Sequence, residues 1–250
     1  VNELLLTDFD EQGGVAARAS LDIALSDFIT LNAAGRIETI GYGGIEQKVQ
    51  ERRQDDYYQY NVNAGIDLGK LLPEKANTVI PVRYSLSHEI VNPKYNPLDK
   101  DILLKDALEA TSTKAQRDSI LDVAQDMTMT QSLSVPGIRV GITSKDGPRP
   151  WDPANFTLNF SFSKQAKMDP TTEYEYTNDY RGSFQYSYSP YVKGLKPWSW
   201  IKSKNKNLKF LKDWELNYLP NTISFLTSMS RYYYEQQTRS EVDVMFQLPV

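Results

Sequence analysis

The sequence has no cysteine and a single histidine, His88, in 250 residues. The absence of cysteine excludes a disulfide scaffold and any thiolate metal site. The net charge of −4 gives no case for nucleic-acid binding, which needs a clustered basic surface. No apolar run approaches the roughly 18 residues of a membrane-spanning helix. Composition therefore predicts a chain without a transmembrane helix and without a nucleic-acid partner.

Motifs for catalysis are equally scarce. No Ser/His/Asp arrangement forms around His88, and no glycine-rich phosphate loop is present. Paired carboxylates occur at Asp8 and Asp10, Asp55 and Asp56, and Asp99 and Asp101. The segment 8–14 has part of a calcium-loop spacing but lacks the third ligand and the distal glutamate. We therefore expect no enzyme activity and no catalytic, metal or cofactor site.

Several segments of the chain alternate apolar and polar residues with a period of two. In 58–68, Tyr58, Tyr60, Val62, Ala64, Ile66 and Leu68 alternate with polar or small residues. The same alternation recurs at 156–162 and 180–188. Successive side chains of a strand point to opposite faces, so each segment predicts a strand with one apolar and one polar face.

About ten such strands are expected in an all-β, antiparallel fold. They lie near 15–26, 29–40, 57–69, 78–90, 129–142, 155–164, 178–190, 212–219, 222–235 and 241–248. Lengths near ten residues fit tilted strands that cross a bilayer and exceed the common strand of about five or six. The pattern fits a transmembrane β-barrel, a soluble β-sandwich that binds glycan or protein, or a small-solute porin.

The connections carry further predictions. Residues 32–35 and 219–222 resemble tight turns. The stretch 91–126 is a long excursion with one short helix at about 112–126, which Ser112 is placed to cap. Short turns at one end of the sheet and long loops at the other would match outer-membrane barrels. Pro81, Pro136 and Pro190 each predict an edge, a bulge or a strand end, because proline cannot donate to the ladder.

One segment is both basic and aromatic. Residues 193–212 contain seven lysines, with Trp198, Trp200 and Phe210 among them. This composition favours an interfacial segment at an anionic membrane surface, with a solvated loop as the alternative.

Short motifs spread over most of the chain resemble the SprA/Sov family, the outer-membrane translocon of the Bacteroidetes type IX secretion system. They lie at 1–4, 7–11, 13–14, 16–17, 43–47, 51–52, 80–82, 92–102, 151–152, 155–156, 217–220 and 231–235. Examples are Gly43-Gly44-Ile45-Glu46-Gln47 and Asn92-Pro93-Lys94-Tyr95-Asn96-Pro97. Family members are far longer, so the chain is expected to be an internal fragment.

The resemblance implies a role as well as a fold. The family forms a very large single-chain transmembrane barrel of about 36 strands, of which 1–250 would be one segment. Its pore passes folded cargo that carries a C-terminal signal domain, in secretion and gliding motility. The implied partners are the rest of the same barrel, a PorV-like small barrel at a lateral gate, a periplasmic plug protein, the cargo and the lipid bilayer. The implied location is the bacterial outer membrane.

Overall fold

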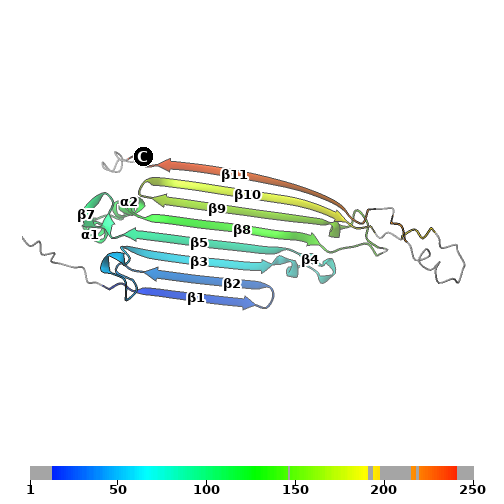
Figure 1. Cartoon of the computed structure of the whole chain (residues 1–250), viewed down its shortest axis with the longest axis horizontal. Coiled ribbons are helices and arrows are strands. Elements are labelled where there is room, and N and C mark those ends of the chain that lie inside the picture. The colour runs from blue at the N-terminus through cyan, green and yellow to red at the C-terminus, as the bar shows by residue number, and fades with distance from the viewer. Residues whose placement is uncertain (1–12, 146, 191–193, 198–214, 218–219, 241–250) are drawn as a thin grey trace, which may run out of the picture.

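The computed structural model describes residues 13–145, 147–190, 194–197, 215–217 and 220–240, and it is built around one antiparallel sheet (Figure 1). The strand order is β1-β2-β3-β5-β8-β9-β10-β11, with β4 paired to β8. The strands are β1 (Ala16–Leu25), β2 (Ile29–Glu38), β3 (Asp55–Asp67), β4 (Thr78–Val79), β5 (Pro81–Pro93), β8 (Asp126–Val140), β9 (Phe156–Asp169), β10 (Thr172–Tyr188) and β11 (Ile223–Thr238). Apart from β4, the strands of this sheet lie side by side in the order in which they occur along the chain, so the sheet is an up-and-down meander.

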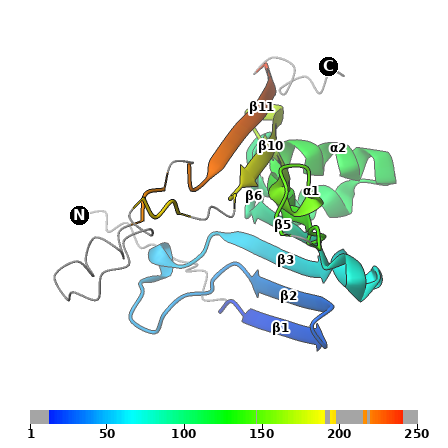
Figure 2. The same ribbon diagram turned by 90° about the vertical axis from the view of Figure 1, so that its right-hand side faces the viewer.

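The sheet is a single curved layer that does not close on itself (Figure 2). β1 and β11 form its two edges. Among the described residues only Leu104, Ala124 and Ala166 are buried hydrophobic residues, and no large side chain is fully buried. A chain of this length normally buries most of its apolar surface, so the sheet lacks the core that would let it stand alone. The all-β antiparallel prediction is confirmed, whereas a closed barrel is not seen.

Small helices lie at one end of the sheet (Figure 1). There the connection between β5 and β8 folds into the two-stranded sheet β6 (Tyr95–Asn96) and β7 (Asp99–Leu103) and the helices α1 (Leu104–Ala110) and α2 (Lys114–Ala124). We call this the helix end and the opposite one the far end. Short 3-10 turns, η1 (Val49–Glu51), η2 (Leu68–Leu71), η3 (Glu74–Ala76) and η4 (Pro153–Asn155), occupy other connections. No helix in the described ranges has the length and apolar character needed to cross a membrane.

The predicted excursion at 91–126 corresponds to 94–125, between β5 and β8, and α2 falls inside the predicted helix. The prediction of a single helix was wrong, because α1 has only seven residues and too few turns to show periodicity. The predicted cap was one residue early. Thr113 rather than Ser112 caps α2, since the Thr113 Oγ1 accepts the backbone N–H of Gln116 at 3.4 Å.

The three prolines behave as predicted. Pro81 is the first residue of β5, and Pro190 lies two residues beyond Tyr188, the last residue of β10. Pro136 lies at a break in the β8–β9 register, between Val135 and Ile138, where Gly137 takes a φ of 69°. A bulge removes the need for the ladder hydrogen bond that proline lacks.

Two predictions about connections were wrong. Residues 32–35 are not a turn but the middle of β2, where Gly35 pairs with Tyr60; small residues on a flat, paired strand resemble a turn in sequence alone. Short and long connections are not segregated either. The β1–β2 turn at 26–28 lies at the far end and the β9–β10 turn at 170–171 at the helix end, while both ends also carry long connections.

Parts of other predictions fall on residues outside the described ranges. Most of the basic aromatic segment 193–212 and the strand at 241–248 are among them. Of the strand predicted at 212–219, Glu215–Asn217 is described, and Leu216 forms an isolated bridge with Leu195. Lys196 pairs with Glu215 at 2.6 Å beside this bridge.

Candidate functional surface: the two faces of the sheet

The strand register keeps the apolar alternation on one face across all eight meander strands. Leu21, Ala33, Val62 and Leu86 form one continuous row of paired residues across β1, β2, β3 and β5. Further along, Phe162 pairs with Leu133 and Tyr180, and Phe160 with Val135 and Gly182. We call this the apolar face and the opposite one the polar face. Directly paired residues lie on the same face of a sheet, so a one-residue slip in any pair would have mixed the two faces.

The apolar face is open to its surroundings. Leu25 is 58% exposed, Leu158 48%, Phe225 57% and Met229 77%. Its aromatic residues contact each other across neighbouring strands, with 4.7 Å between the ring centroids of Phe162 and Tyr180. Isolated exposed hydrophobic residues are common, but a continuous apolar sheet face marks a membrane or interaction surface.

Polar residues interrupt this face along a diagonal line. Gln131, Lys164 and Asn178 occupy a single row on β8, β9 and β10. On β5 this row contains Leu86, and His88 lies two residues nearer the helix end. On β11 it contains Tyr233, and Arg231 lies two residues nearer the far end. We call His88, Gln131, Lys164, Asn178 and Arg231 the polar line. It advances toward the far end from β5 to β11.

The apolar stretches shift in the same direction. On β1 the stretch runs from Ala17 to Leu25 and centres on Leu21; on β11 it runs from Ile223 to Met229 and centres on position 226. Followed through the strand pairs, the row of Leu21 reaches β11 at Tyr233. The apolar stretch of β11 centres on position 226 instead, so its centre lies seven residues nearer the far end than this row. That shift is ~23 Å along the strands over a sheet width of ~34 Å. The band of apolar residues therefore crosses the strands at about 35°, within the tilt range of membrane barrels.

The polar face carries small hydroxyl and amide side chains that satisfy one another. The hydroxyls of Ser85 and Ser132 lie 3.2 Å apart, and the Asn159 amide donates to the Ser183 hydroxyl at 2.9 Å. Arg181 pairs with Asp179 on the same face. This chemistry offers hydrogen bonds and little apolar area.

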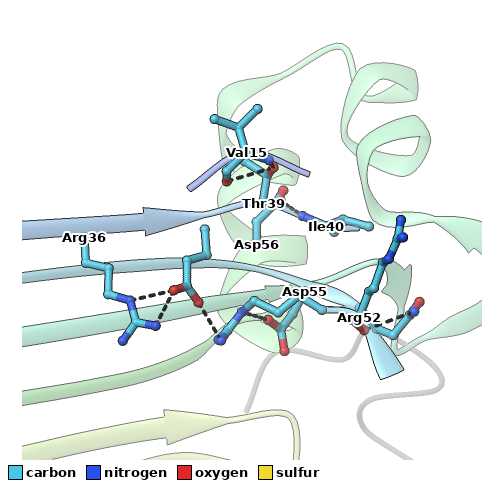
Figure 3. A network of polar contacts seen from close by, with 10 residues as sticks. Val15, Arg36, Thr39, Ile40, Arg52, Asp55 and Asp56 are labelled. Carbon is cyan, nitrogen blue, oxygen red and sulfur yellow. Dashed lines mark hydrogen bonds and ion pairs between the residues drawn. The ribbon is translucent and has the colours of Figure 1, made fainter. Parts of the chain in front are cut away.

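A charged cluster ties the β2–β3 connection to the polar face at the helix end (Figure 3). Glu38 is 4% exposed and accepts the Arg36 Nε at 2.6 Å and the Arg53 Nη1 at 2.9 Å. Arg53 also donates to Asp55 at 2.8 Å, and its guanidinium stacks 4.5 Å from the centre of the Tyr57 ring. Asp56 accepts the backbone N–H of Ile40 at 2.9 Å. The cluster fixes residues 39–54 rather than forming an open binding site.

The connection 141–155 at the far end is held by one carboxylate. Asp152 accepts the Ser144 hydroxyl at 2.5 Å, the Ser144 N–H at 3.1 Å and the Arg149 N–H at 2.8 Å. These hydrogen bonds lower the pKa of Asp152, because they favour its charged form. The Tyr186 hydroxyl donates to Pro150 O at 2.9 Å, so this loop lies against the end of the apolar face. Trp151 is 68% exposed there.

The structure does not assemble the other residues considered from sequence into a site. His88 lies on the apolar face with its ring edge-on to Tyr60, 5.0 Å between centroids, and its Nδ1 is buried without a partner in the described chain. Asp55 and Asp56 engage separate partners, and the Asp99 carboxylate accepts the N–H of Asp101. Asp8 and Asp10 are outside the described residues. Over the residues that the structure describes, no group of three or more acidic or histidine residues is placed to hold a metal.

A family model described as a motility related/secretion protein, SprA_N, matches residues 1–108. The match covers somewhat less than half of the chain, and over these residues the chain is similar to the SprA family. The resemblance inferred from short motifs is thereby confirmed for a region that includes β1, β2, β3 and β5. No curated protein matches the chain.

The SprA_N match and the geometry of the sheet are independent observations, and both are consistent with a secretion-related protein. The family match indicates a protein of secretion and motility. The tilted apolar band and polar line were not predicted from sequence, because both depend on which residues pair across strands. The signal that could have revealed them is the drift in position of the polar interruptions from one strand to the next.

Proposed function

We propose that this chain is a wall segment of an outer-membrane, protein-conducting β-barrel of the type IX secretion system, through which folded cargo passes. The tilt of the apolar band carries the proposal. In a barrel whose strands tilt by ~35–45°, the lipid-facing band must cross the strands obliquely. A face packed inside a soluble protein has no reason to follow a line set by a membrane plane.

The lack of a covering layer argues in the same direction. A β-sandwich would place a second sheet about 10 Å from the apolar face, with interlocked side chains between them. The other sheet in the described chain, β6 and β7, has two strands and lies at the helix end. In lipid, the exposed side chains of this face would be in their preferred environment, provided that every strand is paired. We therefore propose that the rest of the barrel pairs with the edges β1 and β11.

The polar face would then line the pore. Hydroxyl and amide groups that already hydrogen-bond to one another would offer a passing folded protein little apolar area and few unpaired polar groups to bind. The wall would be passive and non-enzymatic. Selection would reside in partners of the kind that the SprA resemblance implies, a PorV-like small barrel, a periplasmic plug protein and cargo with a C-terminal signal domain.

The experiment is a matched pair of charge insertions in the full-length protein. Val62→Arg and Phe160→Arg place a charge on the apolar face, whereas Asn61→Arg and Ser161→Arg place it on the adjacent position of the polar face. Arginine facing mid-membrane costs about 2–4 kcal/mol, so the first pair should reduce assembled barrel in outer-membrane fractions and the second should not. Equal behaviour of the two pairs would contradict the proposal.

Cargo transport separates this role from that of a small-solute porin. Depletion of the full-length protein should stop release of a reporter fused to the C-terminal signal domain of a secreted protein. Uptake of small sugars and amino acids should persist. The opposite pattern would identify a porin.

A further inference from the structure

A hollow lies on the apolar face where Gly182 interrupts a row of large side chains. Gly182 pairs with Phe160 on one side and Met229 on the other, and a Cβ built on it would meet nothing within 4 Å. The hollow has a volume of about 510 Å³, and Phe160, Asn178, Tyr180, Met229, Arg231 and Tyr233 contribute to its lining. It is apolar toward the far end and polar toward the helix end.

Two cations flank its polar end. Arg231 lines the hollow, and Lys164 lies two strands away in the row of Asn178, a separation of about 10 Å between strands. Neither forms an ion pair within the described ranges; the Lys164 Nζ lies 5.5 Å from the centre of the Tyr176 ring. Both side chains are long enough to reach one group placed between them.

The polar groups next to the two cations leave one acceptor unused and no free carboxylate nearby. Between the two cations, the Asn178 Oδ1 is buried without a hydrogen-bond partner in the described chain. The one nearby carboxylate on this face, Glu235, is already engaged by the hydroxyls of Tyr174 at 3.2 Å and Tyr233 at 2.5 Å. The site thus offers two positive charges and an unused acceptor beside an apolar hollow.

We propose that this hollow binds an anionic phospholipid, with its phosphate between Lys164 and Arg231 and an acyl chain over Gly182. The inference rests on the proposed membrane role, in which the polar line lies at headgroup level and the hollow points into the apolar band. The phosphate matches the two cations, a headgroup hydroxyl matches the free Asn178 acceptor, and the chain fills the space that glycine leaves. A charged pair on an otherwise lipid-facing surface is costly unless such a partner receives it.

The test uses the full-length protein purified in mild detergent from vesicles of equimolar phosphatidylethanolamine and phosphatidylglycerol. Native mass spectrometry counts the lipids that stay bound. Wild type should retain phosphatidylglycerol preferentially. One basic side chain near an anionic lipid raises the affinity about fivefold, and two independent contributions multiply. Arg231→Gln or Lys164→Gln should therefore weaken retention about fivefold, and the double variant about thirtyfold. Gly182→Leu, which fills the hollow, should abolish it.

Two control variants isolate the site. Arg83→Gln removes a charge from the polar face of β5, away from the hollow, and Gly35→Leu adds the same bulk elsewhere on the apolar face, where the added Cβ would lie 3.9 Å from Gln59 O. Both should retain the lipid as wild type does. Equal retention by Gly182→Leu, Arg231→Gln and wild type in a barrel found in the outer membrane would overturn the lipid site alone. A wild-type protein absent from the membrane fraction would overturn the proposed function, and the lipid site with it.

Discussion

Leu21 and Tyr233 lie in the same row of the sheet, joined through seven successive strand pairs, yet they belong to different levels of the apolar band. Leu21 is at the centre of the apolar stretch of β1. Tyr233 lies beyond the apolar stretch of β11, on the helix-end side of Arg231. A row perpendicular to tilted strands changes depth as it crosses a barrel wall.

This relationship predicts the membrane depth of individual side chains. Residues 1–250 contain no cysteine, so single cysteines at Leu21, Phe225 and Tyr233 can each carry a nitroxide label in a full-length protein whose cysteines elsewhere, if present, are replaced by serine. Power-saturation electron paramagnetic resonance should place Leu21 and Phe225 at similar depth. Tyr233 should be shallower by about 20 Å, from its distance along a strand tilted by ~35°. If Leu21 and Tyr233 proved equally deep, the strands would not be tilted as inferred.

The buried Glu38 predicts how the β2–β3 connection is held. In Glu38→Gln the two guanidinium groups of Arg36 and Arg53 lose their shared carboxylate, at a cost of about 1 kcal/mol or more. The N–H of Gly41 and that of Arg53, which bond to Arg53 O and Tyr42 O, should then exchange with deuterium about tenfold faster. Glu46→Gln, at an exposed position of the same connection, is the control and should leave these amides unchanged.

The bulge in β8 predicts a glycine requirement at one position. Gly137 has a φ of 69°, and its N–H donates to Asn159 Oδ1 at 2.7 Å. Gly137→Ala should destabilise the assembled protein by about 1–2 kcal/mol, because a Cβ is strained in the left-handed region. Urea unfolding of the detergent-solubilised protein measures this. Gly182→Ala, where φ is not positive and space is open, should be nearly neutral; equal losses in both would contradict the strain argument.

The lowered pKa of Asp152 predicts an acid-sensitive loop. Because the folded pKa lies below the ordinary value of 3.8, the hydrogen bonds from Ser144 and Arg149 contribute fully above pH 3.8. Their contribution disappears as the pH falls through the lower, folded value. Fluorine NMR of fluorotryptophan at Trp151 should report the opening of 141–155 in this acidic range.

Asp152→Asn provides the comparison for the acid test. It removes the titrating carboxylate, so the Trp151 signal should lose its acid transition and resemble the opened loop at neutral pH. A transition that persisted unchanged in this variant would assign the pH dependence to another group.

Sequence reasoning recovered most strands because their two-residue alternation is strong, as at Tyr58 to Ile66 in β3. It also located the effects of Pro81, Pro136 and Pro190, since a missing N–H has the same consequence in any sheet. It failed at residues 32–35, where Asn, Ala and Gly resemble a turn but are held in an extended strand by pairing with β3, as between Gly35 and Tyr60. It missed α1, a helix of seven residues that contacts β6 and β7 and buries Leu104, because so short a helix shows no periodicity.

The order of residues along the chain determined which side chains alternate, which segments form most of the strands and that no catalytic motif is present; these depend on neighbours a few positions apart. Its short motifs also indicated the family. Only the tertiary structure decided the register between strands, and with it the tilted apolar band, the polar line from His88 to Arg231 and the hollow at Gly182. The reason is physical: hydrogen bonds between strands, not the sequence of any one strand, set which residues share a row across the sheet.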